Sequence, residues 1–156
     1  MGHAGGVGDD DPGRVQGERE ERRAAFEALV AAQRRAERAE SLEARKLIAG
    51  FVRRARELGI EPVRLRGRSY RGRGTFPTAL TGWYLQRSGP LAVGTDGEFY
   101  VLTGDPGLLG RFRGVEIPAT DPPLTIGRGA RDGESMPLQD LLDSRLAAGP
   151  DFPDPR

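Results

Sequence analysis

The sequence predicts an α+β fold, in which a long N-terminal helix and a C-terminal helix pack on one face of a small antiparallel sheet. Residues 18–58 lack proline and consist mainly of Ala, Arg, Glu and Leu, which favour helix. Three short apolar runs near the middle of the chain are separated by turn sequences. Leucines at helical spacing recur between residues 136 and 147, ahead of a Gly-Pro stop.

Residues 1–17 are expected to form a disordered N-terminal tail. They are rich in Gly and Asp and bury too little apolar surface to offset the entropy lost on ordering the backbone. The segment lacks the basic and apolar regions of a secretory signal, and the chain has no cysteine. We therefore expect a cytoplasmic protein. The single histidine, His3, lies in this tail and is expected to be solvated rather than to bind a metal.

The long helix is predicted over residues 18–58, with Gly59 ending it. Its apolar residues form two groups on one face, at about 100° per residue. The second group is expected to pack on the sheet and comprises Ala44, Leu47, Ile48, Phe51, Ala55 and Leu58. Because both groups keep to one face, the sequence favours one continuous helix with a polar stretch between them. A break near Ser41 is the alternative.

The first apolar group, Phe26, Leu29 and Val30, has no obvious place in the core. A straight helix of this length would reach roughly 60 Å, which exceeds a domain of this size. Residues 18–40 are therefore predicted to project from the domain. We expect this group to be a helix interface, either with a second copy as a short coiled coil or with another protein. A frayed or back-folded helix is the alternative.

A compact α+β domain is predicted over residues 41–148. At the centre of its sheet we expect a three-stranded antiparallel meander, because Ser88-Gly89-Pro90 and Thr95-Asp96-Gly97 are strong turn sequences. The three strands are Trp83–Gln86, Leu91–Gly94 and Phe99–Leu102. The side chains expected to face the helices are those of Trp83, Leu85, Phe99 and Val101.

Shorter elements complete the predicted domain. Residues 61–68 alternate apolar and basic side chains, as in a half-buried strand, and residues 115–117 and 124–126 are brief strand candidates. A final helix is expected from Met136 to Ala147, with Ser135 as its N-cap. Residues 149–156 are predicted to be a flexible tail.

Positive charge is concentrated in one segment. Residues 53–73 carry eight basic and two acidic side chains, a net charge of +6 in a chain of net charge +1. Arginine binds phosphate bidentately and an aromatic ring can stack on a base. We therefore hypothesise that this segment contacts nucleic acid or an acidic partner, through Arg64, Arg66, Arg68, Tyr70, Arg71 and Arg73. The alternative is that these side chains are solvated or paired with acidic residues between 96 and 143. Almost every basic residue of the chain is arginine, so an arginine-rich segment does not by itself indicate binding.

The composition argues against an enzyme. Without cysteine, and with one histidine near the terminus, the chain offers no Ser-His-Asp set and no thiolate nucleophile. Its glycine-rich loops lack the Lys-Ser/Thr of a P-loop and the dinucleotide-binding spacing, so no cofactor is expected. Asp132 and Glu134 lack a third ligand, so no metal is expected either. No apolar run is long enough to span a membrane.

We therefore expect a small non-enzymatic binding or adaptor protein that engages a protein partner or a second copy through its long helix. The alternative is a nucleic-acid-associated protein that contacts phosphates through the segment from Arg64 to Arg73.

Overall fold

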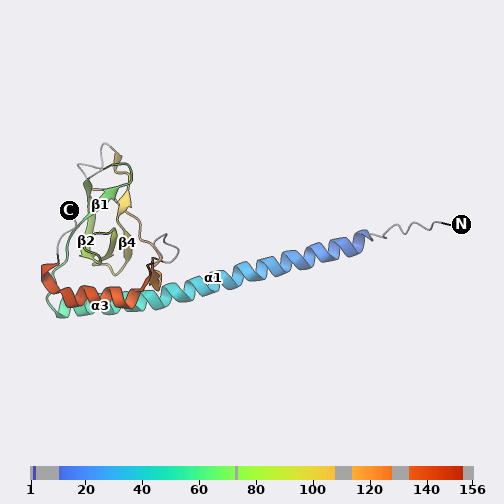
Figure 1. Ribbon diagram of the computed structural model, residues 1–156, viewed down its shortest axis with the longest axis horizontal. Helices are drawn as coiled ribbons and strands as arrows, with labels where there is room; N and C mark the ends of the chain where they lie inside the picture. The colour runs from blue at the N-terminus through green and yellow to red at the C-terminus, as the bar shows by residue number, and fades with distance from the viewer. Residues whose placement is uncertain (1, 3–10, 73, 108–113, 128–133, 153–156) are drawn as a thin grey trace. The chain divides into compact units, whose positions relative to one another are not determined.

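The computed structural model describes residue 2 and residues 11–72, 74–107, 114–127 and 134–152. It confirms the α+β class, with a long helix, a five-stranded sheet and a C-terminal helix (Figure 1). The chain divides into two units, residues 1–39 and residues 40–156. Residue 1 and residues 3–10 of the predicted disordered tail lie outside the described residues.

Helix α1 spans Pro12–Glu57 and therefore starts earlier than the predicted Glu18. Asp11 caps it, because its carboxylate accepts a hydrogen bond from the Gly13 N–H at 3.2 Å. Pro12 suits the first helical position, where its missing N–H costs nothing. The predicted tail is thus helical from Pro12 onward, and the cap and the proline together explain the earlier start.

The helix is continuous through Ser41 and ends where the sequence predicted. Gly59 has a φ of 70°, which glycine adopts without steric cost. The N–H of Gly59 donates to the Arg56 carbonyl at 3.1 Å, and that of Ile60 donates to the Ala55 carbonyl at 2.9 Å. These two bonds are the Schellman pattern that satisfies the last carbonyls of a helix.

The sheet is mixed rather than purely antiparallel. Its strands are β1 (Val63–Ser69), β2 (Thr75–Tyr84), β3 (Leu91–Gly94), β4 (Phe99–Val101) and β5 (Thr103–Gly104). The order is β4-β3-β2-β1-β5, and β1 pairs with β5 in parallel. The meander β2-β3-β4 therefore lies toward one edge, and not at the centre as predicted.

Strands β4 and β5 lie at opposite edges of the sheet, yet Leu102 alone separates them in sequence. The Leu102 N–H donates to the Pro90 carbonyl at 2.6 Å, and the Leu102 carbonyl accepts from the Arg68 N–H at 2.8 Å. One extended residue covers only about 3.3 Å. The two edges must therefore meet at Leu102, so the sheet curls into a small barrel-like layer.

The first strand of the meander differs from its prediction at both ends. It begins at Thr75 rather than Trp83, and it stops at Tyr84 rather than Gln86. The longer strand includes Pro77, which cannot donate to a sheet ladder. The structure accommodates it, because the Pro77 carbonyl accepts from the Val115 N–H at 2.9 Å and thus still contributes to pairing.

The two faces of the curled sheet form two hydrophobic clusters, as the period of two requires. The helix-facing cluster joins α1 and the C-terminal helix to the sheet through Ala44, Ile48, Phe51, Ala55, Trp83, Leu85, Val93, Phe99, Leu138, Leu141 and Leu142, with Val101 against it. This confirms the predicted aromatic face. The enclosed cluster contains Leu65, Tyr84, Ala92, Tyr100 and Leu102.

Trp83 is the largest buried side chain of the helix-facing cluster. Its ring meets that of Phe51 edge to face, with centroids 6.0 Å apart, and its Nε1 donates to the Ile60 carbonyl at 2.8 Å. The indole therefore joins helix, sheet and the connecting turn, while its only polar atom is satisfied.

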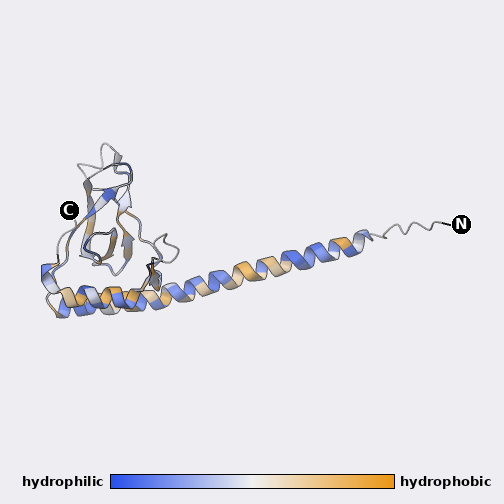
Figure 2. Ribbon diagram, in the orientation of Figure 1, coloured by the Kyte–Doolittle hydropathy of each residue, from blue (hydrophilic) through white to orange (hydrophobic). Residues whose placement is uncertain are grey.

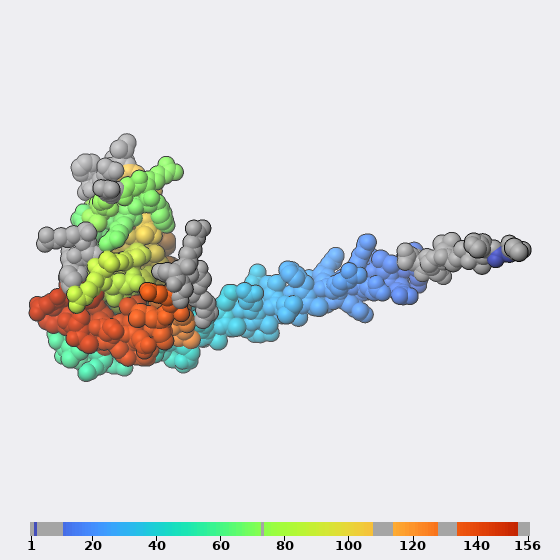
Figure 3. All heavy atoms as spheres, viewed as in Figure 1, coloured from blue at the N-terminus to red at the C-terminus, as the bar shows by residue number. Residues whose placement is uncertain are grey.

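The C-terminal helix, α3 (Leu138–Ala148), begins later than predicted. Met136–Pro137 instead forms strand β7, which pairs with β6 (Thr125–Ile126), and Ser135 makes no cap. The Leu138 N–H finds its acceptor in the Leu124 carbonyl at 2.7 Å. Figure 3 shows the atoms of α3 alongside the last turns of α1.

Arg145 of α3 is buried, and it orders the segment that follows the helix. Its Nε donates to the Tyr84 carbonyl at 2.8 Å, its Nη1 donates to the Gly149 carbonyl at 2.9 Å, and its guanidinium stacks on Phe152 at 4.1 Å. Residues 149–151 form the 3₁₀ helix η1 (Gly149–Asp151). The predicted flexible tail is therefore packed up to Phe152, and residues 153–156 lie outside the described residues.

We predict that Ile48→Ala destabilises the protein by about 2–5 kcal/mol, because Ile48 is fully buried and its loss leaves a cavity. The measurement is urea unfolding followed by the fluorescence of the single tryptophan. Leu42→Ala on the same helix is the control; Leu42 is exposed, so its change should stay within about 0.5 kcal/mol. Equal losses for the two variants would contradict the assigned packing of α1.

Candidate interaction surfaces

Residues 24–32 of α1, with the sequence AAFEALVAA, form an apolar band that contains one polar side chain, Glu27. Phe26 is 67% exposed and Leu29 is 70% exposed, whereas Val30 is partly buried. Figure 2 shows the band as an orange segment between polar stretches of the helix. The structure thus places all three predicted interface residues on one stretch of exposed helix.

The described residues of the first unit provide no surface against which the band could pack. Among its described residues none is buried, and from residue 12 onward its only element is α1. Side-chain pairs support the polar turns on either side: Arg14 and Glu18 approach to 3.4 Å, and Gln33 donates to Glu37 at 3.2 Å. Such pairs contribute about 0.2–0.5 kcal/mol each. The band itself gains stability only by burial against another surface.

Strand β1 carries a row of arginines, which we name the arginine row: Arg64, Arg66 and Arg68. Alternate residues of a strand project to one face. Leu65 and Gly67, between them, are buried, so the arginines share the outer face as predicted. Arg64 Nη1 lies 3.3 Å from the Thr78 carbonyl and Arg66 Nε lies 2.9 Å from Thr75 Oγ1.

A β-bulge between Arg64 and Arg66 shapes this strand. Two hydroxyls satisfy the backbone groups that the bulge removes from the ladder. The Arg66 N–H donates to Tyr84 Oη at 2.9 Å, and buried Thr78 donates to the Leu65 carbonyl at 2.6 Å. Both hydroxyls belong to β2, so these bonds hold β1 and β2 together where their register shifts.

The turn after β1 adds an exposed aromatic ring. Tyr70 is 73% exposed, and its hydroxyl accepts a hydrogen bond from Thr103 at 3.5 Å. Arg71 is also exposed, and its N–H donates to Ser69 Oγ at 3.3 Å. Arg73 lies outside the described residues. The structure therefore brings five of the six predicted contact residues to one strand and its turn.

The described carboxylates do not neutralise the arginine row. Within the described part of the chain, no ion pair involves the arginine row or Arg71. Arg45 behaves differently, because Glu98 and Asp121 bind its two terminal nitrogens at 2.9 and 3.0 Å. The hydrogen bond with Glu98 is the main cause that raises the pKa of Arg45. The proposed pairing of the row with acids of residues 96–143 is thus not found among the described residues.

The acids near the β3–β4 turn act as structural partners. Asp96 Oδ1 accepts the Glu98 N–H at 2.9 Å, and Asp96 Oδ2 accepts the Tyr100 hydroxyl at 2.5 Å. Burial, with the Asp96 hydrogen bond as the second cause, raises the pKa of Tyr100 to about 12.

No group of three potential ligands that could hold a metal occurs among the described residues. Glu134 is exposed, and Asp132 lies outside the described residues.

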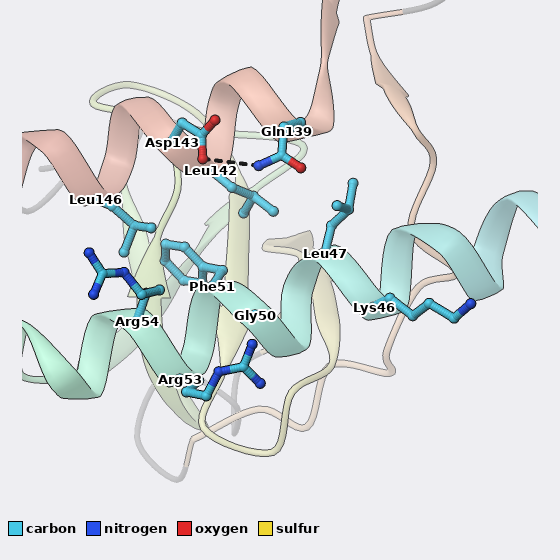
Figure 4. A pocket seen from close by; sticks show the side chains of 10 residues that line it. All are labelled: Lys46, Leu47, Gly50, Phe51, Arg53, Arg54, Gln139, Leu142, Asp143 and Leu146. Carbon is cyan, nitrogen blue, oxygen red and sulfur yellow. Dashed lines mark hydrogen bonds between the residues drawn. The ribbon is translucent and has the colours of Figure 1, made fainter.

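A shallow groove between α1 and α3 was not predicted (Figure 4). Its volume is about 260 Å³, and it is lined by Lys46, Leu47, Gly50, Phe51, Arg53, Arg54, Gln139, Leu142, Asp143 and Leu146. Apolar side chains form its floor and three basic residues stand at its rim. Sequence periodicity could find each apolar stripe but not that the two helices lie side by side.

Comparison of the chain with family models, curated proteins and solved structures found no match. Among the helices described, none combines the length and the apolar character needed to cross a lipid bilayer.

The raised pKa of Tyr100 predicts a loss of stability at alkaline pH. As the pH rises from 10 toward about 12, the unfolded chain loses the phenol proton while the folded chain keeps it. The contribution of Tyr100 is therefore complete below pH 10 and disappears as the pH passes through its folded pKa. Urea unfolding of the parent and of Tyr100→Phe across this range measures the difference.

Exposed Tyr70 supplies the control for that experiment: Tyr70→Phe should lose stability with pH as the parent does. If the parent and Tyr100→Phe instead lose stability in parallel from pH 10 to 12, the contact of Tyr100 with Asp96 does not hold the proton.

Proposed function

We propose that this protein is a non-enzymatic binding or adaptor protein that engages a protein partner or a second copy through the apolar band of α1. The exposure of Phe26 and Leu29 on a helix without other elements in its unit supports this proposal. Contiguous exposed apolar residues are typical of protein interaction sites. We also propose that it acts in the cytoplasm, since a chain without cysteine needs no oxidising compartment.

The chemistry of the band fits a helical partner. Phe26, Leu29 and Val30 follow the i, i+3, i+4 spacing by which one helix docks its apolar side on another surface. Burying a side chain such as Phe or Leu stabilises a complex by about 1.5–3 kcal/mol. Two large side chains and several alanines therefore favour a reversible contact, because association itself costs several kcal/mol.

We predict that Phe26→Glu combined with Leu29→Glu abolishes the association of the full chain, because it places charges in the surface to be buried. The species to be measured are those that covalent cross-linking captures in extracts of the cells that produce the protein, together with the solution mass of the purified chain.

Ala28→Glu combined with Ala31→Glu is the matched control. Within the band, we assign the contact to the side that carries Phe26, Leu29 and Val30, and Ala28 and Ala31 lie on the opposite side of the same turns. This control should leave the association intact. If both double variants form the same cross-linked species as the parent, the band is not the binding surface.

A second function, contact with nucleic acid, is favoured by the arginine row. Three guanidinium groups without ion pairs among the described residues stand beside an exposed aromatic ring. Arginines neutralise phosphates, and an aromatic side chain gives a base a platform for stacking. In this second proposal, Tyr70 and the arginine row contact single-stranded DNA or RNA.

We predict that the full chain binds a single-stranded oligonucleotide at low salt and that its affinity falls as the salt concentration rises. Arg66→Glu combined with Arg71→Glu should weaken this binding by at least about tenfold. Fluorescence anisotropy measures this directly. Arg34→Glu combined with Arg35→Glu changes the net charge equally on α1 and should have a smaller effect. A chain that fails to bind at low salt would end this proposal.

A further inference from the structure

We infer that the surface that covers the apolar band is the same band of a second copy, with the two helices antiparallel. This inference rests on the proposed function, and it names the partner of the same site. The order of charges along the face of α1 that carries Phe26, Leu29 and Val30 supports it.

That face has opposite charges at the two ends of the band. At 3.6 residues per turn, Arg19 and Arg22 lie on the same face as Phe26, two turns and one turn before it, respectively. Glu37 and Glu40 lie on this face after the band. The face therefore runs from basic through apolar to acidic along the helix.

In an antiparallel pair, this order of charges places complementary side chains of the two copies opposite each other. When its centre falls between Leu29 and Val30, Leu29 lies opposite Val30 of the second copy. By the same spacing, Phe26 lies opposite Gln33 and Arg22 lies opposite Glu37 of the second copy. Because the pair is symmetric, each contact occurs twice. Apolar residues thus meet at the centre and opposite charges meet at both ends.

A parallel pair in register gives the reverse result. Each residue then lies opposite its own copy, so that Arg22 faces Arg22 and Glu37 faces Glu37. Charges beside the seam of two paired helices select orientation and partner. The same face that favours the antiparallel pair thus disfavours the parallel one.

Three contacts within one chain limit the strength of this pairing. Arg22 Nη2 lies 3.8 Å from Glu18, Gln33 donates to Glu37 at 3.2 Å, and Glu40 accepts the Leu124 N–H at 3.0 Å. Glu40 is tied to a distant segment of its own chain, whereas the partners of Arg22 and Glu37 lie on the same helix, so Arg22 and Glu37 are the pair that orients the two helices. With few large apolar residues in the band, we expect a dimer that forms and dissociates with concentration.

Sedimentation equilibrium of the full chain over a wide concentration range tests the inference. The expected result is a monomer–dimer equilibrium in which Arg22→Glu or Glu37→Arg alone raises the dissociation constant by roughly tenfold. The combination of Arg22→Glu and Glu37→Arg should restore it, because the charges again oppose. Glu21→Arg combined with Arg35→Glu makes the same exchange on the opposite face and should change nothing.

A cysteine introduced into this cysteine-free chain reports the orientation independently. Antiparallel helices place residue 33 of one copy about 10 Å along the axis from residue 33 of the other. Gln33→Cys should therefore form no disulfide, which needs Cα atoms within about 7 Å. A Gln33→Cys disulfide dimer, or no rescue by the double charge reversal, would overturn the antiparallel arrangement.

A chain that stays monomeric at every concentration would overturn the second copy as the partner. The proposed function would still hold if the chain forms a cross-linked complex with a different protein and Phe26→Glu with Leu29→Glu removes that complex. The failure of the inference and the failure of the proposed function are therefore distinguishable.

Discussion

The packing of the last turns of α1 on the sheet is the contact on which the rest of the structure depends. Ile48 and Phe51 of the helix meet Trp83 of β2 in one buried cluster, which also receives α3. Trp83 in turn fixes the turn after the helix through its hydrogen bond to Ile60. Without this contact, neither the curled sheet nor α3 would have an apolar surface against which to pack.

Curling of the sheet lets so small a domain bury both of its sheet faces. One face lies against the helices, and the other is enclosed as Leu102 joins the two edges. Closure leaves the outer side of β1 for polar residues, and that is where the arginine row lies. The candidate nucleic-acid surface is therefore a direct consequence of the way in which the sheet closes.

Local patterns in the sequence predicted the features that depend on local geometry. The spacing of Ile48 and Phe51 identified the buried side of α1, Gly59 marked its end, and the period of two placed the arginine row on one face. Features that depend on distant residues escaped prediction. The parallel pairing of β1 with β5 has no local turn signal, and the extension of β2 back to Thr75 depends on its pairing with β1.

The candidate surfaces also include some features that local sequence predicts and others that depend on distant residues. Phe26 and Leu29 could be found from helical spacing alone, because among the described residues of their unit only α1 itself surrounds them. The absence of ion pairs between the arginine row and the described carboxylates, the burial of Arg145 and the groove between α1 and α3 depend on which segments meet in three dimensions. The composition limits which kinds of contact can form, but it does not determine which segments meet.

One face of α1 contributes Ala44, Ile48, Phe51 and Ala55 to the core and leaves Phe26 and Leu29 exposed, and we propose that a partner binds there. Amide hydrogen exchange along α1 in dilute full-length protein tests this claim most directly. The account predicts slow exchange at Ile48 and Phe51 and fast exchange at Phe26 and Leu29, with protection of the latter pair rising on association. Equal exchange at the two sites in dilute protein would contradict it.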